Sequence, residues 1–348
     1  MNSQLDTLTL GRFVLFQRKE QLFNILLYHL PKTLANNEIL IRNCYATICE
    51  SDICAFCEND LEPIFGHEIV GDILSIQSRS TIKDLRGKKV SVGDRLIWAF
   101  FSTPQKTGGY KYGYLPATYS NLFRGRFADY SIIQNKTGFL KINKQIPLKV
   151  VAPISYGHVT IAGALNIVGD IKGKRILIFG ADLLGLSCSA MCKEGKAIYV
   201  GVIDSEVVRL IWANDFGADE LFFNKNRYQL PEVDIIFDMT RSFDSETILK
   251  RLQLLTTGGI AVWIGSGFPE SAVKKIYAEY IVRKGLQVKG FYNYNYNDLI
   301  NATIFIENNY QKYPFEQIVE QEFSLEMIER AFHYAIKKKT IRVGVKIK

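Results

Sequence analysis

One stretch, residues 174–204, restricts the fold of this chain more than any other. An apolar run, Arg175-Ile-Leu-Ile-Phe179, leads into Gly180-Ala-Asp182-Leu-Leu-Gly185, and a helical segment and a second apolar run then end at Asp204. A strand, a glycine turn, a helix and another strand in this order form a right-handed βαβ unit. Similar apolar runs recur at 233–238 and 259–264 between amphipathic segments, which predicts a doubly wound parallel sheet.

The same unit predicts a dinucleotide site. The helix after the glycine turn presents its N-terminus to a pyrophosphate, and Asp204 is placed to accept hydrogen bonds from the ribose hydroxyls. The carboxylate of Asp204 favours NAD over NADP, because it would repel a 2′-phosphate. Arg209 is the residue that could bind such a phosphate and so permit NADP. The middle glycine of the usual pattern is Asp182, which adds bulk and negative charge. Either the loop is re-routed with Asp182 turned to solvent, or the cofactor binds weakly or not at all.

A second set of residues lies in the N-terminal third of the chain. Cys49-Glu-Ser51-Asp52-Ile-Cys54 is followed by Gly66-His67-Glu68-Ile-Val-Gly71. A thiolate, an imidazole and a carboxylate are the donors that a catalytic zinc takes, and Ser51 is close enough in sequence to hydrogen-bond a metal-bound alcohol. β-Branched and aromatic runs at 12–16, 22–27 and 38–42 predict that this part of the chain is built of strands.

These motifs, with Gly93-Asp94-Arg95-Leu96 and Gly125-Arg-Phe127-Ala-Asp129-Tyr130 in the same order, resemble the zinc-containing alcohol dehydrogenases of the medium-chain dehydrogenase/reductase superfamily. The resemblance implies an α/β fold with two domains. Residues 1–155 and 301–348 would form a GroES-like, β-rich catalytic domain, and residues 156–300 a Rossmann dinucleotide-binding domain. A homodimer, through the sheet edge near 288–292, or a homotetramer is also implied.

Three short segments resemble one subgroup of these alcohol dehydrogenases. Pro104-Gln-Lys106, Lys111-Tyr-Gly113 and Val151-Ala-Pro153 are most similar to the alcohol dehydrogenases associated with phosphonate metabolism. Trp98, Phe100 and Phe101 fall where the family places the walls of its substrate pocket, although ordinary core packing explains them equally well.

The resemblance also assigns roles to residues. Cys49 and His67 would bind zinc, Glu68 would be the carboxylate beside it, and the family's third ligand falls on Tyr156 or Ala152, so that His158 is the alternative donor. Ser51 would take the alcohol proton, Thr160 would hold the nicotinamide, and Cys54 replaces the histidine that usually ends the proton relay. The residues assigned to the cofactor are Gly180, Asp182, Leu183, Gly185, Asp204, Arg209, Gly265 and Arg342.

The cysteines limit the metal chemistry. Residues 58–187 contain no cysteine, so the chain has no four-cysteine structural zinc of the kind that many relatives carry. A different site remains open, because Cys44, Cys49, Cys54 and Cys57 are clustered and four thiolates can hold zinc or an iron–sulfur cluster. Against it, strand alternation at 38–45 directs Cys44 into the barrel.

Composition restricts the partners. The net charge of +8 comes from scattered Lys and Arg rather than a clustered basic face, which argues against nucleic-acid binding. No signal peptide or membrane-length apolar segment is present, so we expect a cytoplasmic protein with a small-molecule substrate and no membrane contact. The composition of residues 98–126, rich in Gly, Tyr, Pro, Thr and Asn, predicts a long irregular insert. Its tyrosines, Tyr110, Tyr112, Tyr114 and Tyr119, form either an aromatic lid or oligomer contact, or a loop packed on itself.

The predicted function is NAD(H)-dependent interconversion of an alcohol and a carbonyl with the help of Zn²⁺. Two alternatives remain open. Positions 54, 156 and 182 all depart from the family pattern, which suggests a repurposed, non-catalytic fold that serves as a binding or assembly module. A zinc-free reductase of the same superfamily is the other alternative, and its activity would survive chelation.

Overall fold

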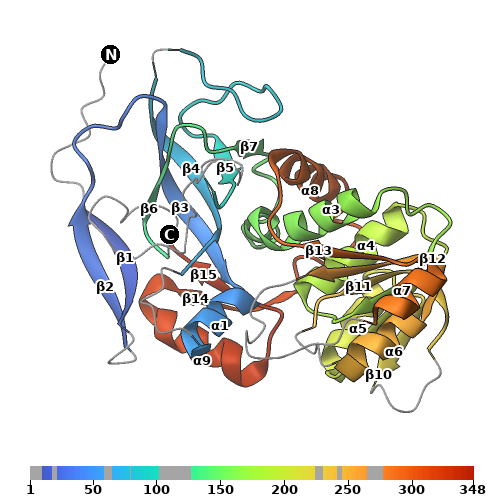
Figure 1. Ribbon diagram of the computed structural model, residues 1–348. Helices are drawn as coiled ribbons and strands as arrows, with labels where there is room; N and C mark the ends of the chain where they lie inside the picture. The colour runs from blue at the N-terminus through green and yellow to red at the C-terminus, as the bar shows by residue number, and fades with distance from the viewer. Residues whose placement is uncertain are drawn as a thin grey trace. The chain divides into compact units, whose positions relative to one another are not determined.

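The computed structural model describes residues 10–17, 22–58, 65–78, 80–101, 127–223, 230–240, 245–264 and 277–348. The chain divides into two compact units (Figure 1), one of residues 1–156, 299–311 and 315–348, the other of residues 157–298 and 312–314. Most of the predicted insert, with its four tyrosines and the segments 104–106 and 111–113, lies outside the described residues. Gly265 lies outside them as well.

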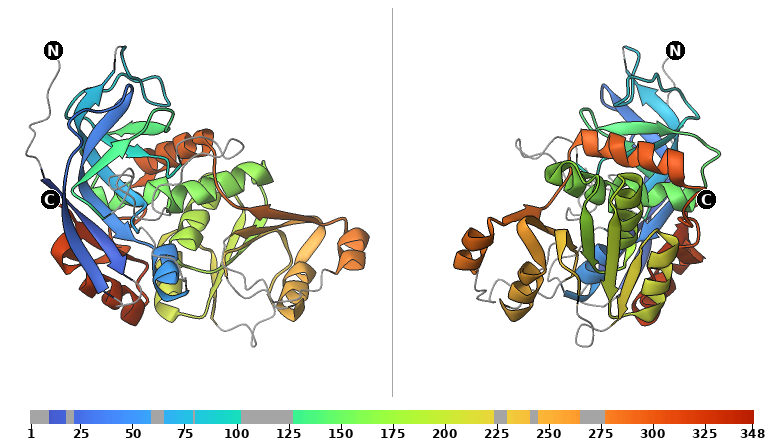
Figure 2. Two further views of the ribbon diagram at one scale, coloured as in Figure 1. Left: turned by 60° about the vertical axis from the view of Figure 1, so that its left-hand side comes forward. Right: turned by 90° about the vertical axis from the view of Figure 1, so that its right-hand side faces the viewer.

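The second unit is built on a six-stranded parallel sheet in the order β10-β9-β8-β11-β12-β13. Its strands are β8 (Arg175–Phe179), β9 (Tyr199–Asp204), β10 (Glu220–Phe223), β11 (Val233–Asp238), β12 (Leu255–Ile264) and β13 (Gln287–Phe291). Helices α3 (Gly157–Val168), α4 (Leu183–Glu194), α5 (Val207–Asp215), α6 (Ser245–Gln253) and α7 (Ala278–Lys284) cover both faces of this sheet (Figure 2). This strand order is that of a doubly wound dinucleotide-binding fold, which confirms the prediction.

The first unit is rich in strands, as predicted. Its main sheet has the order β14-β15-β3-β4-β5-β7, with β6 paired to β3, and β1 and β2 form a separate antiparallel ribbon. The strands are β1 (Leu10–Gln17), β2 (Leu22–His29), β3 (Glu38–Ile48), β4 (Glu68–Gln77), β5 (Arg95–Trp98), β6 (Tyr130–Ile133), β7 (Phe139–Ile142), β14 (Val319–Ser324) and β15 (Arg342–Lys346). The helices are α1 (Glu50–Glu58), α2 (Leu148–Val151), η3 (Ala152–Ser155), η4 (Leu325–Met327) and α9 (Ile328–Lys338), and α8 (Tyr296–Asn309) begins in the second unit and continues in the first.

An aromatic cluster holds α1 in place. Phe56 on α1 packs against Phe16 and Phe23 of the β1–β2 ribbon, with ring centroids 4.9 and 5.6 Å away, and against Phe332 of α9 at 5.5 Å. Aromatic pairs at such spacings add to the stabilisation from buried area. The cluster therefore fixes the helix whose first turn carries Ser51 and Asp52.

Strand pairing brings distant residues to one edge of the main sheet. β3 ends where β4 begins, with Thr47 opposite Glu68, and β15 runs along the other side of β3, with Val343 opposite Ile48. The residues just beyond these strand ends, Cys49 and His67, therefore lie near each other and near Arg342, the first residue of β15.

Tight packing between β15 and β3 gives a stability prediction. A Cβ atom on Gly344 would lie 1.9 Å from the hydroxyl of Tyr45, a buried side chain whose hydroxyl donates to Glu322 over 2.8 Å. We expect Gly344→Ala to lower the free energy of unfolding by about 1–3 kcal/mol, because the tyrosine must move. Urea denaturation followed by circular dichroism measures this. Gly290→Ala, where an added Cβ meets nothing within 4 Å, is the matched strand control and should cost clearly less.

In the described ranges no single helix is long and apolar enough to cross a membrane. One bent helix pair, 148–155 with 157–168, is together long and apolar enough to do so by length and composition alone. Most of its residues are buried in the fold.

Candidate active site

Cys49, Ser51 and His67 form a compact triangle of side chains. The Sγ atom of Cys49 lies 3.0 Å from Nε2 of His67 and 2.7 Å from Oγ of Ser51, and Oγ of Ser51 lies 3.1 Å from the same Nε2. Cys49 and His67 are buried and Ser51 is half-buried. The structure thus brings together three residues that the sequence assigned to one site.

Asp52 joins this triangle from behind the imidazole. One of its oxygens lies 3.5 Å from Nδ1 of His67, and the other accepts the backbone N–H of Cys49 over 3.0 Å. An acid three residues after a helix cap that reaches back to the cap N–H is half of a capping box. Asp52 therefore starts α1 and also directs Nε2 of His67 toward Cys49. Sequence reasoning gave Asp52 no role, although its spacing from Cys49 carried this capping signal.

Burial controls the charge of Cys49. It raises the pKa of the Cys49 thiol well above its usual value, and the carboxylates of Asp52 and Glu68 raise it further. The thiol is therefore neutral in this arrangement, although Arg342 and the hydrogen bond with Ser51 act in the opposite direction.

Glu68 and Arg342 have different roles from those the sequence suggested. The guanidinium of Arg342 donates from Nε and Nη2 to the two carboxylate oxygens of Glu68, over 2.9 and 3.0 Å, and the hydroxyl of Thr47 donates to the same carboxylate over 2.5 Å. Glu68 is fully buried and Arg342 is 4% exposed. Glu68 is therefore bound to a cation of its own chain, and the predicted pyrophosphate arginine is occupied inside the first unit.

An aromatic ring stands where the resemblance places a third zinc ligand. The ring of Tyr156 meets that of His67 edge-on, with centroids 4.2 Å apart, and also contacts Phe100, whose centroid is 5.5 Å away. Trp98, Phe100 and Phe101 are all buried. The predicted alternative donor, His158, lies in the second unit, where its Nδ1 is 2.8 Å from Oγ of Ser187.

These contacts test whether the residues fit a catalytic zinc ion. In a tetrahedral site, a sulfur and a nitrogen ligand lie about 3.5 Å apart, so Cys49 and His67 need only a small shift. Asp52 has ligand atoms within 4.8 Å of both, but it faces Nδ1 while Cys49 faces Nε2, so it orients the imidazole rather than sharing the cation. A catalytic zinc takes three protein donors, and the described residues supply two. The donor set is incomplete.

The four-thiolate alternative does not form in the described part of the chain. A bulge in β3 leaves Cys44 as the extra residue between Asn43, which pairs with Gly71, and Tyr45, which pairs with Val70. The strand alternation that was expected to point Cys44 into the barrel is interrupted there, and Cys44 instead lines a surface pocket. Cys54 and Cys57 lie on α1, and no cysteine cluster appears among the described candidate metal groups.

The predicted nucleotide loop has the expected backbone. Gly180 has φ +103°, and a Cβ on Gly185 would lie 1.9 Å from the carbonyl oxygen of Gly180, so both positions need glycine. Asp204 ends β9 and accepts the N–H groups of Ala181 and Glu206 over 2.6 and 2.8 Å. The strand, turn, helix and acid of the prediction are all present.

Asp182 faces the start of its own helix rather than solvent. It is the N-cap of α4, and its Oδ1 accepts the N–H groups of Leu184 and Gly185 over 3.0 and 3.2 Å. Those amides lie at the helix end that binds pyrophosphate in folds of this kind. A carboxylate of the chain therefore occupies the amides that a dinucleotide would need.

The other predicted cofactor residues of the second unit are divided between core and surface. Leu183 is fully buried at the start of α4, so it supports the loop by packing. Thr160 on α3 and Arg209 on α5 are half-buried.

Comparisons with known proteins agree with this architecture. Residues 35–144 match the alcohol dehydrogenase GroES-like domain. An alcohol dehydrogenase of Malus domestica is 25% identical over 64% of this chain and 60% of its own length, and an L-threonine 3-dehydrogenase of Edwardsiella ictaluri is 24% identical over 74% of this chain and 78% of its own. The match therefore spans less than two thirds of the first of these relatives.

Structural similarity covers more of the chain. The crystal structure of an alcohol dehydrogenase from Thermotoga maritima superposes with a TM-score of 0.85 and 20% identity, over 97% of this chain and 99% of that one. Residues 35–144 thus match an alcohol dehydrogenase GroES-like domain, and the chain shares its fold with a solved alcohol dehydrogenase.

Proposed function

We propose that this chain is an oxidoreductase that interconverts an alcohol and a carbonyl compound with NAD(H). The GroES-like domain, the dehydrogenases among its relatives and the doubly wound sheet support this reaction class. The observation that carries the proposal is the set of contacts from Ser51 to His67, a hydrogen bond, and from His67 to Asp52, an ion pair, because together they can take a proton from an alcohol.

The geometry gives each residue a role. Ser51 faces Nε2 of His67 over 3.1 Å, so it can accept a proton from the substrate hydroxyl while passing its own to the imidazole. Asp52, 3.5 Å from Nδ1, stabilises the positive charge that then forms on the ring. A bound NAD(H) would supply the hydride acceptor or donor for this chemistry. Cys54 on α1 is not needed as the end of the relay.

We place the metal-free form of this chemistry ahead of the zinc-assisted form. If Zn²⁺ binds, Cys49 and His67 would hold it, and Glu68 could join them only by breaking its pair with Arg342. The chain's own relay already provides a base, so the proposed reaction does not depend on the incomplete donor set.

Substitution of His67 tests the relay. We expect His67→Ala to lower kcat/KM by about 10²–10⁴-fold, the usual contribution of a general base, and the activity of the unmodified chain to survive dialysis against a chelator. NADH absorbance with a panel of primary and secondary alcohols, aldehydes and ketones measures both. His29→Ala, at an exposed histidine of β2, is the control. Activity that is lost on chelation and restored by zinc would show that the metal-assisted form is correct.

A second candidate function is a non-catalytic binding or assembly module. Two observations favour it: Asp182 occupies the amides of α4, and Tyr156 stands at the third-ligand position. Absence of both metal and NADH binding in the purified protein would support this candidate.

The finer assignments are proposals of the same kind. They are a substrate related to phosphonate metabolism, a cytoplasmic location, and assembly into a homodimer through β13, which is an edge strand of its sheet.

A further inference from the structure

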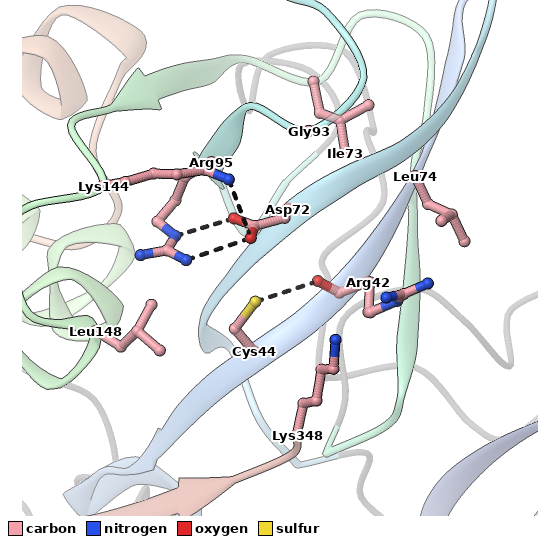
Figure 3. A pocket seen from close by; sticks show the side chains of 10 residues that line it. All are labelled: Arg42, Cys44, Asp72, Ile73, Leu74, Gly93, Arg95, Lys144, Leu148 and Lys348. Carbon is pink, nitrogen blue, oxygen red and sulfur yellow. Dashed lines mark hydrogen bonds and ion pairs between the residues drawn. The ribbon is translucent and has the colours of Figure 1, made fainter.

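A pocket of about 620 Å³ opens on the first unit (Figure 3). None of its lining residues belongs to the Cys49–His67 site. Its charged lining consists of four cationic side chains and one carboxylate, contributed by Arg42, Arg95, Lys144, Lys348 and Asp72. The volume is within the range of small-molecule sites, which usually extends from about 300 to 1,000 Å³.

Strand register places three of these charges side by side. Arg42 on β3 is opposite Asp72 on β4, and Asp72 is opposite Arg95 on β5. Residues paired in this way across neighbouring strands project from the same face of a sheet. Lys144 follows the end of β7, the next strand, and reaches the same carboxylate. The sheet itself therefore positions the charged wall of the pocket.

The charges of the pocket do not balance. Nε and Nη2 of Arg95 donate to Asp72 over 2.9 and 3.3 Å, and Nζ of Lys144 lies 3.4 Å from it. Burial alone would raise the pKa of Asp72, but these two cations hold it below its usual value, so the carboxylate is ionised. Four cationic side chains thus face one anionic side chain. Neither Arg42 nor Lys348 forms a side-chain ion pair with any described residue.

The rest of the lining adds no negative charge and supplies apolar contact. Cys44, at the bulge of β3, has its Sγ 3.7 Å from the carbonyl oxygen of Arg42. Burial raises the pKa of its thiol, which therefore stays neutral at physiological pH. Leu74 and Leu148 contribute aliphatic surface, and Figure 3 shows them on opposite sides of the charged groups.

We propose that this pocket binds a small phosphorylated organic molecule. The excess of cationic side chains favours a dianion over a carboxylate, and the guanidinium of Arg42, which forms no ion pair with a described residue, matches the oxygen geometry of phosphate. The aliphatic residues favour a ligand with a short apolar body over inorganic phosphate. This binding site is separate from the Cys49–His67 site, and its test does not depend on the proposed oxidoreductase activity.

Isothermal titration of the full chain with phenyl phosphate, inorganic phosphate and benzoate tests this assignment. We expect phenyl phosphate to bind most tightly, with an affinity that falls as salt is raised, because the pocket charges are partly exposed to solvent. The double variant Arg42→Gln/Lys348→Gln should weaken phenyl phosphate binding at least about tenfold. Lys337→Gln/Lys338→Gln, at exposed positions of α9, removes the same charge elsewhere and should leave binding unchanged.

Three results would overturn the proposal: no binding of phenyl phosphate, equal loss in the two double variants, or tighter binding of benzoate than of phenyl phosphate. Thermal unfolding of each variant without ligand shows whether it is folded. If the Arg42→Gln/Lys348→Gln protein is unfolded, Lys144→Gln, at a half-exposed side chain, replaces it and should give a smaller loss of the same sign.

Discussion

Replacing Glu68 with glutamine is expected to lower the free energy of unfolding by about 3–5 kcal/mol, because it leaves the buried guanidinium of Arg342 without its counter-charge. Glu68 is fully buried. It accepts two hydrogen bonds from the guanidinium of Arg342 and one from the hydroxyl of Thr47. The pair also joins β4 to β15 at the edge where Cys49 and His67 lie. Urea denaturation at neutral pH measures the loss.

Two further variants show whether the loss of stability comes from the broken Glu68–Arg342 ion pair or from a general disturbance of the fold. Glu68→Gln/Arg342→Met removes both charges and should recover most of the stability, since a buried pair replaced by uncharged groups is often close to neutral. Glu246→Gln, in the exposed pair that Glu246 forms with Lys250 on α6, should change stability by no more than about 0.5 kcal/mol. A Glu68→Gln protein as stable as the unmodified chain would show that Arg342 finds another partner.

Replacing Asp182 with glycine is expected to tighten NADH binding at least about tenfold, which corresponds to about 1.4 kcal/mol. The change frees the N–H groups of Leu184 and Gly185 and removes a negative charge from the positive end of α4. Glycine is itself tolerated as an N-cap, so the helix should lose only a few tenths of a kcal/mol. Fluorescence titration with NADH gives the two dissociation constants.

Asp182→Asn separates the two effects, because asparagine keeps the cap but carries no charge. Its affinity for NADH should lie between those of the unmodified chain and the glycine variant. Equal NADH affinity in all three proteins would mean that the carboxylate moves aside when the cofactor enters. Absence of binding in all three would favour the non-catalytic module.

The doubly wound sheet was predictable because its signals are local. Apolar runs such as 175–179, the glycines that permit the turn at Gly180 and the acid that ends β9 are each encoded within a few residues. The same is true of the Cys49–His67 pair. Their donor types and the family resemblance indicated a shared site, and the pairing of β3 with β4 brings both motifs to one end of the sheet.

Other features depend on contacts that no local pattern reports. Glu68 and Arg342 are 274 positions apart, and only the placement of β15 beside β3 makes them partners. The inward direction expected for Cys44 is another case, since the pairing of β3 with β4 is irregular beside it and Cys44 lines a surface pocket together with Arg42. The pocket with its row of Arg42, Asp72 and Arg95 likewise follows from the register of three strands.

The sequence by itself determined the two folds, the order of their elements and the residue types at the thiol–imidazole site, because turn chemistry and hydrophobic periodicity act over short distances. The tertiary structure alone decided where the charged side chains are directed. Asp182 could face solvent or the end of α4, and Glu68 could face a metal or an arginine. Those choices depend on which donor lies nearest in space, and the folded chain places the α4 amides beside Asp182 and Arg342 beside Glu68.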